Sequence, residues 1–264
     1  MNAKLPGPLS GPNHHFALRP GSDRLVVFFS GTGKAPGKFD FWNVGREIDA
    51  NVLFVNDEGN TWYQHGIKAF GATIDETLSN IKKWRKALGI KNTYLVGASM
   101  GGYGAVLFGA LLNVRVIAFG FDSVLKLPTS QSERLINPSI QPLYPDLRPI
   151  LAQSRAKVYV YAGEMETMDV VSALHISRLA HVSVQTLRGA THASAKFVHD
   201  HADLRLVFSA FLDSKPLPRM HACGKMCSMP SLVDLLHKAH LAHSEKSYEL
   251  SPHDLSIRFE TRPL

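Results

Sequence analysis

Residues 97–101, Gly-Ala-Ser-Met-Gly, place a serine between two glycines with the spacing of a serine nucleophile. A short apolar run precedes them at 92–96, and small, then apolar, residues follow at 102–108. This context predicts a strand, a sharp turn and a buried helix, which is the setting of a nucleophile elbow. Glycines suit such a turn because bulkier neighbours would clash with it. The alternative is a glycine-rich turn in which Ser99 only caps the helix.

A serine hydroxyl is a weak nucleophile at neutral pH, so it needs a base, and the base needs an acid that orients it. His192 lies in a short loop after the last predicted strand, from which an imidazole could reach the serine. Glu166 stands three residues after Gly163, where the acid is expected. Asp169 follows at the start of a helix and could be the acid or merely cap that helix. Both carboxylates stay candidates, with Asp122 a more distant third.

The negative oxygen of a tetrahedral intermediate needs two preorganised donors. The backbone N–H of Met100 is the first candidate, and that of Thr32, in the glycine-rich loop at 31–38, is the second. The alternative for this loop is an ordinary turn between a strand and a helix. A phosphate-binding loop is excluded, because Thr32 occupies the first glycine position of that pattern and Phe39 follows the lysine.

These residues need a scaffold that brings distant segments together. Apolar runs predict strands at 15–19, 25–30, 51–55, 92–96, 114–119, 157–161 and 182–187. Periodic patterns predict helices at 39–48, 73–89, 102–108, 170–180 and 195–212. Alternating strands and helices are typical of an α/β fold, with a mostly parallel sheet covered by helices on both faces. Ser99 and His192 each follow a strand end, where such sheets carry catalytic residues.

Local signals refine this outline. Thr73 and Glu76 form a capping-box pattern at the start of the second helix. Residues 20–23, Pro-Gly-Ser-Asp, predict a hairpin-type connection between the first two strands. Trp62 and Tyr63 follow a strand end and could line the substrate cleft or pack in the core. The proline-rich, irregular segment at 122–156 could form a cap or lid over the site.

The elbow, the acid-bearing loop after Gly163 and the segment 189–192, Gly-Ala-Thr-His, together resemble the α/β-hydrolase superfamily over about residues 15–213. The resemblance implies that fold and a serine esterase mechanism, in which Ser99 carries the acyl group and water releases it. It implies His192 as base and Glu166 or Asp169 as acid. Glu166 departs from the aspartate usual at its position, and the cap is short.

The expected function is therefore a serine hydrolase of the carboxylesterase or deacetylase kind, acting on a small acyl ester of a polar or carbohydrate-like acceptor. One alternative is an O-acyltransferase with the same triad, which passes the acyl group to a carbohydrate or polysaccharide. Another is a binding protein without catalysis on the same fold. The two enzymes differ in whether water is excluded when the acyl-enzyme breaks down, and no sequence motif distinguishes them in this respect.

The expected organisation is an N-terminal extension at 1–14, a hydrolase domain at 15–213 and a partly helical C-terminal extension at 214–264. The last of these could pack on the domain or mediate self-association. With 264 residues, 45% of them hydrophobic and 19% charged, the chain has the composition of a soluble enzyme. It carries no apolar run of membrane-spanning length and no secretory signal, which predicts a cytoplasmic protein.

Charge and cysteine content exclude several other functions. The net charge is +7, but arginine-rich runs and aromatic–basic platforms are missing, so nucleic acid is not an expected partner. A zinc site near the C-terminus would use Cys223, Cys227, His237, His240 and His243. The cysteine spacing fits known sites only loosely, and histidines at every third position are also typical of a solvated helix face. We therefore expect no metal and no cofactor.

Overall fold

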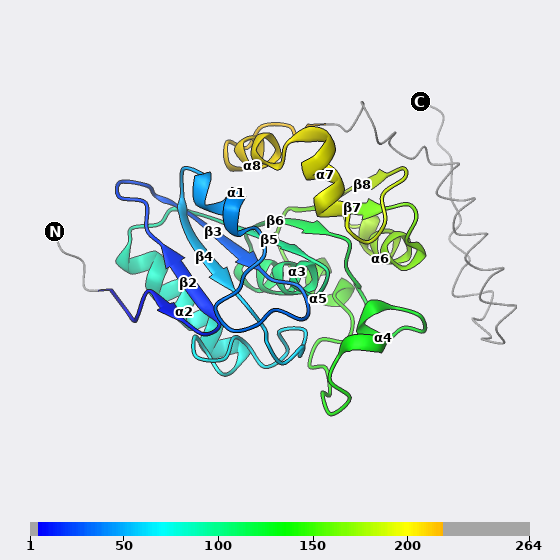
Figure 1. Ribbon diagram of the computed structural model, residues 1–264, viewed down its shortest axis with the longest axis horizontal. Helices are drawn as coiled ribbons and strands as arrows, with labels where there is room; N and C mark the ends of the chain where they lie inside the picture. Colours follow the sequence, from blue (N-terminus) through cyan, green and yellow to red (C-terminus); the bar gives the residue numbers. More distant parts are fainter. Residues whose placement is uncertain (1–4, 219–264) are drawn as a thin grey trace, which may run out of the picture. The chain divides into compact units, whose positions relative to one another are not determined.

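The computed structural model describes residues 5–218, and these contain an eight-stranded sheet (Figure 1). The strands lie in the order β1-β2-β4-β3-β5-β6-β7-β8. Their bounds are β1 (Ser10–Gly11), β2 (His14–Ala17), β3 (Arg24–Phe29), β4 (Asn51–Val55), β5 (Asn92–Ala98), β6 (Arg115–Phe119), β7 (Val158–Gly163) and β8 (Val182–Leu187). From β3 to β8 all neighbouring strands are parallel, whereas β1 and β2 form an antiparallel edge. The expected α/β fold with a mostly parallel sheet is confirmed.

Helices cover both faces of this sheet, as Figure 1 shows. Their bounds are α1 (Trp42–Glu47), α2 (Ile74–Ala87), α3 (Met100–Leu112), α4 (Gln131–Leu135), α5 (Arg148–Ala152), α6 (Thr167–Ser177), α7 (Ser194–Ala202) and α8 (Leu204–Leu212). The predicted cap of α2 is present, since the Glu76 N–H donates to the Thr73 hydroxyl at 3.1 Å. Within residues 5–218 no helix is long and apolar enough to cross a membrane.

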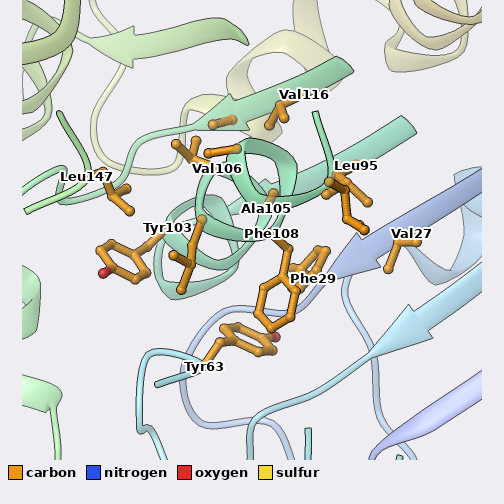
Figure 2. Close-up of a cluster of buried hydrophobic side chains, with 14 of the residues drawn as sticks. Val27, Phe29, Tyr63, Leu95, Tyr103, Ala105, Val106, Phe108, Val116 and Leu147 are labelled. Carbon is orange, nitrogen blue, oxygen red and sulfur yellow. The ribbon is translucent and has the colours of Figure 1, made fainter. Parts of the chain in front are cut away.

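The core lies in two layers because side chains alternate along the buried strands. Leu25, Val27 and Phe29 of β3 face α2 and α3, and Figure 2 shows Val27 and Phe29 with their neighbours on that side. Val26 and Phe28 face the opposite layer, which α1, α7 and α8 complete. A strand that is buried on both faces belongs in the middle of a sheet. β3 therefore lies between β4 and β5, beside the nucleophile.

Two expectations about connections were wrong. Residues 20–23 do not join two paired strands, because β4 lies between β2 and β3 in the sheet. A local turn is present, with the Ser22 N–H donating to the Arg19 carbonyl, but it leads the chain across β4 rather than back along β2. The helix expected at 195–212 is interrupted at Asp203, where φ is 54°. The Asp203 carboxylate accepts the Arg205 N–H at 2.9 Å and so caps the start of α8.

The structure describes most of the expected N-terminal extension but only residues 214–218 of the expected C-terminal one. β1 and β2 extend the sheet to residue 10, which lies within the expected N-terminal extension. The expected C-terminal extension falls outside the described residues from 219 onward, together with Cys223, Cys227 and the three histidines considered for zinc. Segment 122–156 contains only the short helices α4 and α5.

Candidate active site

Ser99 occupies a strained turn between the end of β5 and the start of α3. Its φ is 55° and its ψ is −127°, values that residues with a side chain seldom adopt. The turn leaves no room beside it, because a Cβ on Gly97 would lie 2.0 Å from the Gly101 carbonyl oxygen. The predicted strand, turn and helix are therefore present, and strain of this kind is often found at functional positions.

Three side chains from three strand ends form one hydrogen-bonded series. His192, in the loop after β8, places Nε2 2.9 Å from the Ser99 Oγ. Its other ring nitrogen, Nδ1, lies 2.8 Å from an oxygen of Asp169, in the first turn of α6 after β7. A proton on Nδ1 is donated to the carboxylate, which leaves Nε2 to accept from the serine hydroxyl. The arrangement is that of a nucleophile, a base and an orienting acid.

The other two carboxylates occupy different places. Glu166 is the residue before α6, in extended backbone with φ −116°, and it is not the partner of the His192 ring. Asp122 follows β6 and accepts the Ser132 N–H at 2.6 Å, which ties it to the start of α4. Of the three candidates, Asp169 alone hydrogen-bonds the imidazole.

Burial and the mutual contact of Asp169 and His192 shift both their pKa values. Burial raises the pKa of Asp169 to about 6, and the hydrogen bond from His192 opposes that rise. Burial alone would lower the pKa of His192, but the hydrogen bond and negative charge of Asp169, together with the charges of Asp122 and Glu166, outweigh it and raise the pKa above its ordinary value. The site thus favours the protonated imidazole that forms when the base removes the serine proton.

The two expected oxyanion donors belong to the start of α3, directly after Ser99, and to the loop after β3. Met100 begins α3, so its N–H is one that the helix itself cannot pair. Across from it, a Cβ on Gly31 would lie 3.6 Å from the Ser99 Cβ, so the 31–38 loop approaches the nucleophile closely. The Gly31 N–H is already donated to Asp40 at 2.8 Å. Within residues 5–218 the N–H groups of Met100 and Thr32 make no backbone hydrogen bond.

A cavity of about 580 Å³ opens on Ser99 and His192. One wall comes from the segment leading into α1, and the other comes from α7 and the start of α8. Its lining residues are Phe39, Asp40, Phe41, Trp42, Asn43, Val44, Ala98, Ser99, His192, Ala193, Ala195, Lys196, His199 and Leu204. None of these described lining residues comes from 122–156, so the role of that segment as a cap stays a prediction.

Trp62 and Tyr63, for which we considered either the substrate cleft or the core, lie in the core. Their exposed fractions are 1% and 0%, and Figure 2 shows Tyr63 beside Phe29 and Phe108. The Asp57 carboxylate accepts the Tyr63 N–H at 2.9 Å, and the Tyr63 hydroxyl donates to the Ser30 carbonyl at 2.8 Å. These bonds hold the loop so that both rings point inward.

The aromatic lining was missed because its signal is weak. Phe39, Phe41 and Trp42 follow the glycine-rich loop closely, and the pattern there predicted a helix over 39–48 without a role in the site. Phe41 has φ 59° just before α1, which is an unusual conformation for a bulky residue. Asp40 was also missed. Its carboxylate binds the Gly31 N–H and pairs with Lys34 at 2.6 Å, and so it holds the loop beside the nucleophile.

No family model and no curated protein matches the chain, but many solved structures share its architecture. The capsule O-acetyltransferase of Neisseria meningitidis serogroup A aligns with 80% of this chain and 98% of its own, at 16% identity and TM-score 0.55. The carboxylesterase CesB of Bacillus subtilis aligns with 79% of this chain and 91% of its own, at 14% identity and TM-score 0.52.

The glycosylation-associated Gap123 complex of Streptococcus agalactiae aligns with 76% of this chain, at 19% identity and TM-score 0.53. The chain spans less than half of that relative, since the alignment covers 44% of it. At such low identities these likenesses establish a shared fold and nothing finer. The parallel sheet, the helices on both its faces and these neighbours together show that the chain has the α/β-hydrolase fold.

Proposed function

We propose that this protein is a serine esterase that works through an acyl-enzyme on Ser99. The observation that carries the proposal is the hydrogen-bonded series from Ser99 through His192 to Asp169, with distances of 2.9 and 2.8 Å. The series opens on a cavity large enough for an ester substrate. A serine that only capped α3 would need none of these partners, and its side chain makes no capping bond.

The proposed reaction follows from this geometry. His192 Nε2 takes the proton of Ser99 as the Oγ attacks the ester carbonyl, and Asp169 stabilises the imidazolium. The N–H groups of Met100 and Thr32 receive the negative oxygen of the tetrahedral intermediate. Its collapse breaks the bond to the alcohol oxygen, which takes the proton from His192. Water then repeats the attack on the acyl-enzyme and releases the acid and the free serine.

Labelling with a fluorophosphonate probe tests the nucleophile directly, because the probe requires an activated serine. We expect covalent labelling at Ser99, hydrolysis of p-nitrophenyl acetate, and loss of both in Ser99→Ala. Ser139→Ala is a matched control, since Ser139 is exposed and lies outside the cavity. Failure of the probe to label the folded wild-type protein would favour a binding protein without catalysis and would refute the proposal.

A second candidate is an O-acyltransferase with the same triad and a carbohydrate acceptor. Two observations favour it. The O-acetyltransferase of N. meningitidis aligns over 98% of its length, and the cavity combines the aromatic side chain of Trp42 with polar Asp40 and Asn43, a combination suited to a sugar ring. Release of p-nitrophenol should be measured with and without added saccharides. A large acceptor-dependent increase, with the acyl group recovered on the saccharide, would favour the transferase over the esterase.

A further inference from the structure

Gly120 connects the strand ends that carry the proposed triad. It follows β6 directly, and its carbonyl oxygen accepts the N–H of Ser99 at 2.8 Å. Its own N–H donates to the Tyr161 carbonyl of β7 at 2.9 Å. The backbone of this one residue therefore joins the nucleophile's turn to the strand that leads to the acid.

The space where Gly120 has no side chain is occupied by the other two members of the triad. A Cβ built at this position would lie 2.6 Å from Asp169 Oδ2 and 2.7 Å from the His192 carbonyl oxygen. It would also lie 3.2 Å from the Ser194 hydroxyl, whereas ordinary van der Waals contact begins at 3.4 Å. Gly120 has φ +37°, so a side chain would in addition be strained.

The Asp169 carboxylate is buried and hydrogen-bonded through only one of its two oxygens. The residue is 2% exposed and lies in the first turn of α6. Its Oδ1 is held by His192, and its Oδ2 is buried without a hydrogen-bond partner among the described residues. No hydrogen bond therefore anchors Oδ2, and the position it occupies is open only because Gly120 has no Cβ. A methyl group there must displace the carboxylate, the His192 loop, or both.

We infer that Gly120 is a positioning residue for the triad, resting on the proposed function above. The missing side chain lets the Asp169 carboxylate approach His192 Nδ1, while the Gly120 carbonyl sets the turn that presents Ser99. Gly120 contacts no substrate in this role. It acts through the alignment of the acid with the base, and such alignment is sensitive because a displacement of about 1 Å can cost about a hundredfold in rate.

Gly120→Ala tests the inference. We expect kcat for p-nitrophenyl acetate to fall by roughly a hundredfold with a much smaller change in KM, because Gly120 itself does not line the substrate cavity. The acid limb of the pH–rate profile should move to lower pH, since a displaced carboxylate raises the pKa of His192 less. The far-downfield proton resonance of His192 Nδ1 should weaken or shift, and this readout needs no turnover.

Gly189→Ala is the matched control for backbone strain. Gly189 lies in the loop that leads to His192 and has φ +83°, but a Cβ there would meet nothing within 4 Å. We expect this variant to keep kcat within about threefold of the wild type, because it carries the strain of a positive φ without the contact. An equal loss of kcat in Gly189→Ala and Gly120→Ala would overturn the inference.

A double-mutant cycle with Asp169→Ala separates positioning from general instability. If the methyl group acts through the carboxylate, Gly120→Ala should lower kcat no further once that carboxylate is gone. If Gly120→Ala alone folds poorly, the double variant should yield more folded protein, because it relieves the contact with Asp169 Oδ2 while the contact with the His192 carbonyl remains. An equal or lower yield of folded protein would refute the role assigned to Asp169. Failure of the proposed function is distinguishable, because it would appear as an unlabelled Ser99 in wild-type protein whose Nδ1 resonance still responds to Gly120→Ala.

Discussion

Replacing Asp169 by asparagine should nearly abolish turnover while leaving the fold and substrate binding intact. Asparagine has the same shape as aspartate but no charge. Its amide can present a donor to His192 Nδ1, which would favour the wrong tautomer of the ring. The side chain of Asp169 is 1% exposed, so it cannot contact a substrate in the cavity. The loss is therefore expected in kcat, with KM nearly unchanged.

The size of the loss follows from the geometry. Asp169 Oδ1 lies 2.8 Å from Nδ1, which places its charge close to the positive charge that develops on the ring. At a separation of about 4 Å and an effective dielectric constant of about 20, that attraction is worth about 4 kcal/mol. A hydrogen bond to a charged group is worth about 1.5–3 kcal/mol, part of which is the same attraction. A loss of about 4–5 kcal/mol lowers kcat by about a thousand- to several-thousandfold.

Steady-state kinetics on p-nitrophenyl acetate measures this loss, with Glu166→Gln as the matched variant. This substitution removes one carboxylate charge from the same loop, and Glu166 makes no bond to the His192 ring. We expect Glu166→Gln to keep kcat within about tenfold of the wild type, because the charge of Glu166 acts on His192 and Asp169 less strongly than the direct hydrogen bond between them. The reasoning fails if Asp169→Asn stays within tenfold of the wild type, or if Glu166→Gln is the more damaging change.

Three further predictions follow from the site. The pKa of His192 is raised and the base must be neutral, so kcat/KM should rise with pH through a limb above pH 6.5 that moves to lower pH in Asp169→Asn. Ala195 lines the cavity, so Ala195→Trp should raise KM for a hexanoyl ester more than for an acetyl ester in parallel assays. Burial raises the pKa of Asp122, so between the pKa of the unfolded chain and that of the native protein the native state holds a proton that the unfolded chain has released. The free energy of unfolding therefore falls as pH rises between these two pKa values. Asp122→Asn should flatten that fall, measured by urea unfolding at a series of pH values from about 4 upward.

The scaffold of the site was predictable because its signals are local. The apolar runs of β3 and β5 and the capping residue Thr73 depend only on neighbours along the chain. Parallel strands bring their carboxyl ends to one edge, so the order of Ser99, an acid and His192 along the chain implied that the three lie close together. The order of the strands in the sheet was harder to predict from the sequence. The turn at 20–23 is real, but whether it pairs its flanking strands depends on β4, which lies elsewhere in the sequence.

The sequence could not decide whether Glu166 or Asp169 is the acid that partners His192. The two stand three residues apart at the start of one helix, and residues at that spacing lie on the same face. Periodicity therefore cannot separate them. Burial and backbone conformation do, because Glu166 is still in extended backbone whereas Asp169 lies inside α6 at 2% exposure. The sequence could not decide between cleft and core for Trp62 and Tyr63 either. Whether these rings point inward depends on the fold of their loop, including the hydrogen bond from the Tyr63 N–H to Asp57.

Backbone strain at this site lies close to the residues that would do the chemistry. Ser99 has φ 55°, Phe41 has φ 59° and Gly120 has φ +37°, and the first two line the cavity while the third contacts the triad. Each such conformation at a residue with a side chain costs about 1–3 kcal/mol, so packing in the two core layers of the sheet must hold the strained residue in place. At Phe41 the ring packs on Phe28 and Phe119, with centroids 5.3 and 6.1 Å away, and this packing offsets the cost of the strain. At Ser99 glycine would relieve the strain, whereas serine places its hydroxyl 2.9 Å from His192 Nε2, and the retention of serine in this strained turn therefore supports the proposed nucleophile.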